Sequence, residues 1–130
     1  MVRARQVLLL VVLIGTMVLN GGCIVAAVGL GAGTVAYVRG DLQTVESAGI
    51  DDVYNASLKA VQELELHLTS KSKDALAAEI IAYDAQDKKI TIKLKAAAEG
   101  STKLSIRIGV FGSETKSRLI YQKIHDILRS

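Results

Sequence analysis

The fold is decided by residues 89–110, KITIKLKAAAEGSTKLSIRIGV, where apolar and polar side chains alternate on both sides of a short turn segment. Strict alternation predicts a β-strand with one buried face and one solvated face. Residues 98–101 contain a glycine that suits a hairpin turn, so strands over residues 89–96 and 103–110 should pair antiparallel. The side chains expected to face inward are Ile90, Ile92, Leu94, Ala96, Leu104, Ile106, Ile108 and Val110.

The residues around this hairpin predict the rest of one small domain. Residues 76–83 resemble a strand that enters the hairpin through a polar turn at residues 84–88. Further upstream, apolar residues at helical spacing predict a helix that Asp51 or Asp52 caps and that ends near Leu64. The other predicted elements are a weak strand over residues 42–47, an alternating segment from Leu64 into the polar residues 69–74, and a final helix from the N-cap Ser113 to about Leu128.

This element order, β-α-β-β-β-α, predicts an α+β fold. Two amphipathic helices should cover one face of an antiparallel sheet in a two-layer sandwich. The predicted domain spans residues 41–130, which is long enough for one modest core.

The charge of the chain argues against a nucleic-acid partner. The sequence has 16 basic and 13 acidic residues, and all the acidic ones lie at or beyond Asp41. Without residues 1–22, 14 basic residues remain against the same 13 acidic residues. Such a balance lacks the basic excess that is typical of nucleic-acid binding.

Residues 1–22 are typical of a secretory signal peptide. Arg3 and Arg5 form a positive n-region, residues 7–14 (VLLLVVLI) form a short apolar segment, and two glycines precede Cys23. Residues 23–40 continue as a Gly/Ala-rich apolar segment, which predicts a membrane-proximal tether.

Two kinds of membrane anchor fit this leader. Residues 19–23, LNGGC, resemble the lipobox of bacterial lipoproteins, in which the cysteine thiol receives a diacylglycerol and the new amino group is acylated after cleavage. The resemblance implies that Cys23 carries acyl chains such as palmitate, and Ile24 resembles an outer-membrane sorting residue. The alternative is a single-pass span within residues 7–38, with Gly29 and Gly33 spaced for helix association.

The outward face of the predicted sheet and one corner are candidate interaction sites. The outward face carries Lys89, Lys93, Lys95, Lys103 and Arg107, and it is either an ordinary solvated face or a docking surface for an acidic partner or anionic headgroups. Phe111 lies at the strand-to-helix corner that follows. There it either packs beneath the corner and closes the core or marks a functional loop.

No set of residues assembles into a catalytic, metal or cofactor site. His67 and His125 are far apart in sequence, and Asp84 and Asp87 lack the spacing of a calcium loop. The sequence therefore predicts a protein that is not an enzyme. A small envelope enzyme stays as the weaker alternative, and it would require a deep pocket that contains one of the histidines.

Together with Cys23, the segments AYVRGDL (residues 36–42) and RIGVFGSETKS (residues 107–117) resemble a family of short bacterial lipoproteins with a domain of unknown function. The predicted architecture is also similar to helix-grip-like domains of lipoproteins that assist outer-membrane protein assembly. The resemblance implies no known activity. From the anchor and the small domain together we predict a lipid-anchored binding or scaffold module that faces the periplasm, with the membrane and an envelope protein as partners. The outer membrane is favoured over the inner one. The alternative function is a membrane-anchored structural protein that associates through its Gly/Ala segment.

Overall fold

The computed structural model describes residues 3–12 and 34–130, which belong to two separate compact units. Residues 3–12 form a helix in which the side chains from Val7 to Val12 are exposed. Among the described residues, no helix has both the length and the apolar character needed to cross a bilayer. The predicted lipidation site Cys23, the end of the predicted signal peptide and residues 23–33 of the predicted tether lie outside the described residues.

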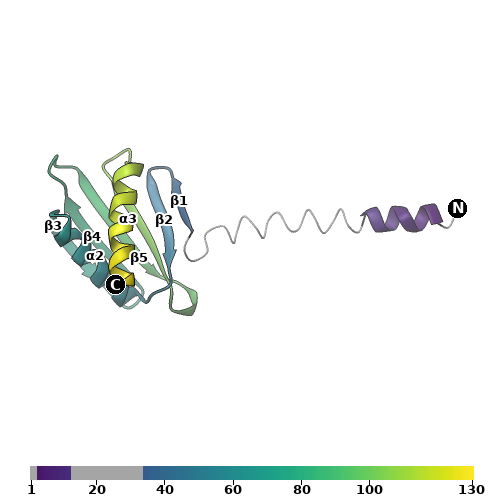
Figure 1. Cartoon of the computed structure of the whole chain (residues 1–130), viewed down its shortest axis with the longest axis horizontal. Coiled ribbons are helices and arrows are strands. Elements are labelled where there is room, and N and C mark those ends of the chain that lie inside the picture. Colours follow the sequence, from purple (N-terminus) through teal and green to yellow (C-terminus); the bar gives the residue numbers. More distant parts are fainter. Residues whose placement is uncertain (1–2, 13–33) are drawn as a thin grey trace. The chain divides into compact units, whose positions relative to one another are not determined.

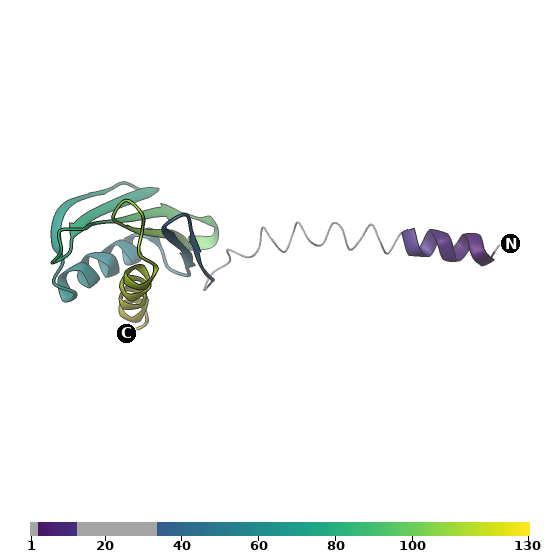
Figure 2. The same ribbon diagram turned by 90° about the horizontal axis from the view of Figure 1, so that it is seen from above.

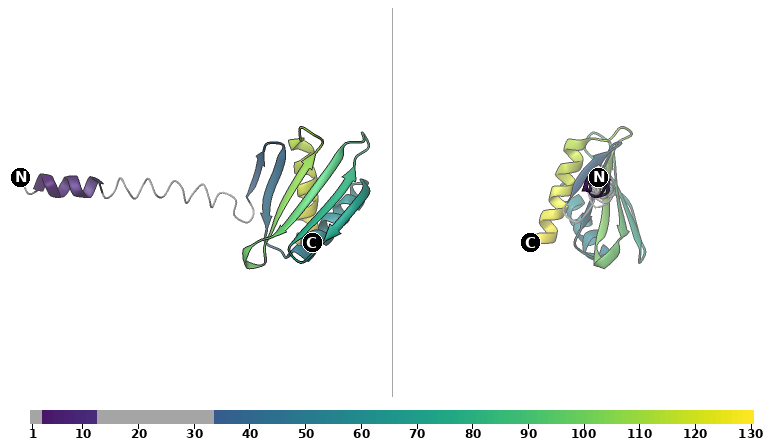
Figure 3. Two further views of the ribbon diagram at one scale, coloured as in Figure 1. Left: turned by 180° about the vertical axis from the view of Figure 1, so that it is seen from behind. Right: turned by 90° about the vertical axis from the view of Figure 1, so that its right-hand side faces the viewer.

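Residues 34–130 form a six-stranded antiparallel sheet with the strand order β1-β2-β6-β5-β4-β3 (Figure 1). Two long helices, α2 and α3, lie together on one face of the sheet, as the view from above and the side view both show (Figures 2 and 3). The elements in chain order are β1 (Val35–Val38), β2 (Asp41–Glu46), α2 (Ile50–Glu63), β3 (His67–Lys73), β4 (Ala77–Tyr83), β5 (Lys89–Ala96), the 3-10 turn η1 (Ala98–Gly100), β6 (Thr102–Ile108) and α3 (Glu114–Arg129).

The structure confirms the predicted α+β fold and adds two strands, β1 and β3, to the predicted order. The sheet begins at Val35 rather than at residue 41, because β1 pairs with β2 along its whole length. Residues 35–38, which the sequence predicts to be part of the tether, instead form an edge strand of the sheet. Their apolar sequence lacks the alternation of a half-exposed strand, so the pairing with β2 alone identifies them as an edge strand.

The core lies between the sheet and the two helices. In the β5–β6 hairpin, Ile92 lies opposite Ile106 and Leu94 opposite Leu104, and all four side chains are buried. Full burial of each such side chain contributes about 1.5–3 kcal/mol. Val110 departs from the prediction, because β6 ends at Ile108 and the side chain of Val110 is 78% exposed.

The helix starts agree only in part with the sequence prediction. Ser113 caps α3 as expected, since its side chain accepts a hydrogen bond from the Lys116 backbone N–H at 3.5 Å. α2 instead begins after Gly49, which provides no side-chain cap, and Asp51 and Asp52 lie within its first turn. The predicted capping role of these aspartates is therefore wrong, although their charge suits the positive end of the helix dipole.

Candidate interaction surfaces

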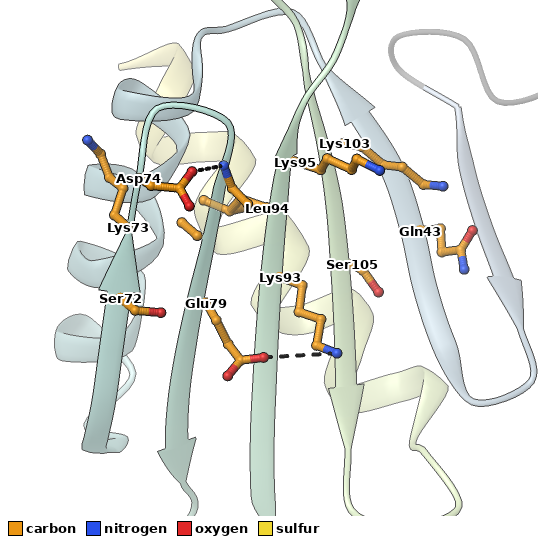
Figure 4. A pocket seen from close by; sticks show the side chains of 12 residues that line it. Gln43, Ser72, Lys73, Asp74, Glu79, Lys93, Leu94, Lys95, Lys103 and Ser105 are labelled. Carbon is orange, nitrogen blue, oxygen red and sulfur yellow. Dashed lines mark hydrogen bonds and ion pairs between the residues drawn. The ribbon is translucent and has the colours of Figure 1, made fainter.

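The face of the sheet that the helices leave uncovered contains a shallow hollow of about 670 Å³. It lies over the ends of β4, β5 and β6, where Lys93, Lys95 and Lys103 project from the sheet (Figure 4). Its lining includes Gln43 and Ser105 on the side of β2 and β6, and the carboxylates of Asp74 and Glu79 on the side of β3 and β4. Three of the five residues predicted as an interaction surface are thus brought together in one hollow.

Lys95 and Lys103 are directly opposite each other on β5 and β6. Both side chains are exposed and extend in the same direction (Figure 4), and no carboxylate of the described residues forms an ion pair with either of them. Lys93 differs, because its Nζ lies 3.9 Å from the carboxylate of Glu79, which is directly opposite it on β4. Because Lys95 and Lys103 have no such partner in the described part of the chain, this end of the hollow has positive charge that the domain itself does not neutralise. Two like charges at directly opposed positions also destabilise a sheet.

Arg107 does not belong to this hollow. Its Nη1 donates hydrogen bonds to the Asp41 carboxylate and to the Arg39 carbonyl, both at 3.0 Å, and its Nη2 donates to the Val110 carbonyl. The guanidinium therefore joins the β1–β2 turn to the loop after β6. The predicted contribution of Arg107 to an open basic face is corrected to that of a clamp between two loops, because most of its hydrogen-bonding capacity is used within the domain.

Of the two alternatives for Phe111, packing beneath its corner is wrong. Phe111 is 93% exposed, and the neighbouring Val110 is 78% exposed. Gly109 and Gly112, on either side of this pair, have φ angles of +67° and +81°, which turn the chain away from the sheet and back toward α3. We refer to Val110 and Phe111 together as the apolar tip.

The backbone behind the apolar tip is tightly packed against the β1–β2 turn. A β-carbon at Gly112 would collide with the backbone of Gly40 and would lie 2.6 Å from the Tyr37 hydroxyl. A β-carbon at Gly40 would lie 2.9 Å from the Phe111 carbonyl oxygen. Only glycine permits this approach, so the tip is presented on a fixed backbone.

A buried polar cluster lies under α3, at the opposite end of β2 from this turn. Glu46 is 6% exposed, and its carboxylate lies 3.2 Å from Nδ1 of His125. The His125 ring lies beside Tyr121, with 5.5 Å between the ring centroids. Burial raises the pKa of the Tyr121 hydroxyl, and the nearby Glu46 carboxylate raises it further.

Sequence reasoning missed this cluster, although a signal was present. Leu42, Thr44 and Glu46 alternate along β2, so Glu46 shares the inward face with an apolar residue. His67, in contrast, lies exposed at the start of β3, and neither histidine lines the hollow on the open sheet face. Within residues 3–12 and 34–130, no group of three or more His, Cys, Asp or Glu side chains could hold a metal ion.

The comparisons with known proteins identify the family of the chain. A search of curated proteins finds no match. A family model described as "Protein of unknown function (DUF3568)" matches residues 6–127, which include most of the helix of residues 3–12 and almost the whole sheet domain. The chain therefore belongs to the DUF3568 family of proteins of unknown function.

Proposed function

We propose that this chain is a lipid-anchored module of the bacterial cell envelope that binds an acidic protein segment on the open face of its sheet. Acylated Cys23 would hold the domain at the outer membrane, facing the periplasm. The observation that carries the binding proposal is the uncompensated pair Lys95 and Lys103 in the hollow of about 670 Å³.

The chemistry of the hollow favours an acidic partner. Two ammonium groups on neighbouring strands form a positive site, and the amide of Gln43 and the hydroxyl of Ser105 offer additional hydrogen bonds to carboxylate oxygens. A bound carboxylate would remove the repulsion between the two lysines, so binding would also relieve an unfavourable interaction within the free domain. The extended strands around the hollow provide a flat surface that suits a peptide segment.

The anchor part of the proposal is supported by the order of features in the leader. A positive n-region, an apolar segment and two small residues are followed immediately by Cys23. The intact mass of membrane-extracted protein, measured beside a Cys23→Ser variant, tests this part. We expect a mass of residues 23–130 plus acyl groups, which the variant lacks. An unmodified mass that retains residues 1–22 would contradict lipidation and indicate a single-pass anchor.

The binding part is tested with the full chain in a non-ionic detergent and a fluorescein-labelled hexaglutamate peptide, followed by fluorescence anisotropy. The double variant Lys95→Gln/Lys103→Gln should weaken binding by about tenfold, which corresponds to ~1.4 kcal/mol. The matched control is Lys59→Gln/Lys71→Gln, which removes two exposed lysines elsewhere on α2 and β3.

Three outcomes are distinguishable. Loss of binding in the hollow variant alone supports the proposal. Equal losses in both variants would show that net charge, and not the hollow, governs binding. If the hollow variant loses affinity for vesicles that contain phosphatidylglycerol but the peptide does not bind to the unmodified chain, the anion is a lipid headgroup and the proposed protein partner is wrong.

A further inference from the structure

We propose that the apolar tip, Val110 and Phe111, contacts lipid by inserting into the headgroup region of an anionic membrane. The inference rests on the proposed membrane anchoring, and it adds a second, peripheral contact that orients the domain. It concerns a different part of the fold from the hollow that contains Lys95 and Lys103.

The first argument is the way the tip is displayed. Single exposed apolar residues are common on protein surfaces, but here two neighbours on one loop are 78% and 93% exposed. Phe111 is the only phenylalanine of the chain, and it lies outside the core. An aromatic ring on a convex corner is typical of side chains that enter the interfacial region of a bilayer.

The second argument is that the loop is fixed in this exposed conformation. The Arg107 guanidinium donates to the Val110 carbonyl, and the Gly40 and Gly112 backbones are in close contact behind the tip. Because the loop is already ordered, little conformational entropy remains to be lost when the two side chains enter lipid.

The third argument is the charge around the tip. Three of the four acidic side chains in the segments around the loop are paired within the domain. The other charged groups there are the exposed cations Arg39 and Lys88 on the adjacent turns and Lys89 at the start of β5, against the single acidic residue Asp87. This net positive rim is complementary to anionic headgroups. The internal pairs are Asp41 with Arg107 at 3.0 Å, Asp84 with Lys116 at 3.0 Å, and Glu114 with Arg118 at 2.8 Å.

Membrane contact through the tip would leave the hollow accessible. The Gly109 N–H donates to the Lys89 carbonyl at 2.8 Å, which places the start of the tip loop beside the first residue of β5. Lys95 lies near the other end of β5, about 20 Å away at the usual rise per residue. The chain between Cys23 and Val35 can span about 40 Å when extended, so its length permits this orientation.

The experiment uses the absence of tryptophan from the chain. A Phe111→Trp variant of the full chain is incorporated into vesicles of phosphatidylcholine with phosphatidylglycerol, and its emission is recorded with and without brominated lipids. The control is Leu76→Trp, at a 70% exposed position in the turn between β3 and β4, at the end of the sheet that contains the hollow. We expect a blue shift and a loss of intensity with brominated lipids for Phe111→Trp, and neither for Leu76→Trp.

The outcomes separate this inference from the proposed function. Sedimentation with the vesicles first tests the anchoring, and failure at that step contradicts both proposals. If the chain sediments but the Phe111→Trp emission stays at the wavelength of a solvated indole without quenching, the tip inference alone is wrong. A blue shift without quenching by brominated lipids would also overturn it, because the ring would then be covered by protein, such as a second copy of the chain.

Discussion

Replacing Lys103 by glutamate should stabilise the domain while it abolishes binding of the acidic peptide. Lys103 lies directly opposite Lys95 on neighbouring strands, and neither ammonium is paired within the described residues. The substitution converts a like-charge pair into an opposite-charge pair. Lysine and glutamate have similarly low β-propensities, so the change in pairing dominates the effect on stability.

The magnitude follows from the register. A cross-strand charge pair contributes roughly 0.2–1 kcal/mol, favourable for opposite charges and unfavourable for like charges. Because both positions are exposed, we expect a combined increase of about 0.5–1 kcal/mol in the free energy of unfolding. For a domain of this size, that increase corresponds to a rise in Tm of about 2–8 °C.

Thermal unfolding of the full chain in non-ionic detergent, followed by circular dichroism at pH 7, measures the effect. Lys95→Glu should give a similar rise, and the double variant Lys95→Glu/Lys103→Glu should fall back to about the stability of the unmodified chain, because two like charges again face each other. The differences should shrink at 1 M NaCl, where the screening length is about 3 Å. A Lys103→Glu variant that is no more stable than the unmodified chain, or a double variant as stable as either single one, would refute the reasoning.

Three further predictions concern the scaffold. Gly112→Ala should lower the free energy of unfolding by more than ~1 kcal/mol, because the new β-carbon meets the backbone of the β1–β2 turn at a φ of +81°; urea unfolding measures this, and an unchanged midpoint would disprove the tight contact. Ile106→Ala, at a fully buried position, should cost about 2–5 kcal/mol, whereas Val110→Ala at its 78% exposed position should change stability by less than about 0.5 kcal/mol; equal costs would contradict the assignment of core and tip. The pKa of Asp84 is lowered chiefly by the backbone N–H of Lys88, so its stabilising effect is present above the ordinary value of 3.8 and is lost as the pH falls through the lower pKa of the folded state. Asp84→Asn should therefore reduce stability at pH 7 and flatten its dependence on pH below 4, and an unchanged pH profile would argue against these hydrogen bonds.

Local patterns in the sequence determined the central part of the fold. The period-two alternation of residues 89–96 is a property of a few consecutive residues, and β5 has those same bounds. The inward set from Ile90 to Ile108 follows from the same alternation, and each of the six isoleucine and leucine side chains of the two strands is buried. The cap at Ser113 is also local, because it depends on one side chain and a backbone N–H three residues later.

Contacts between distant segments decided what the sequence left open. β1 is a strand only because β2 offers it a free edge, and Arg107 is a clamp only because the β1–β2 turn brings Asp41 and the Arg39 carbonyl beside it. The pairing of Lys95 with Lys103 required the register of the hairpin, which alternation within either strand does not specify.

The leader and the apolar tip show the same division between local and tertiary information. The charge, the apolar length and the small residues before Cys23 predict a signal peptide without reference to any fold, because they are properties of a linear segment. Whether Phe111 lies inside or outside the core could not be recognised in that way. An aromatic residue after a strand is equally compatible with both positions, and the close contact of Gly40 with Gly112, across 72 residues of sequence, directs the ring toward solvent.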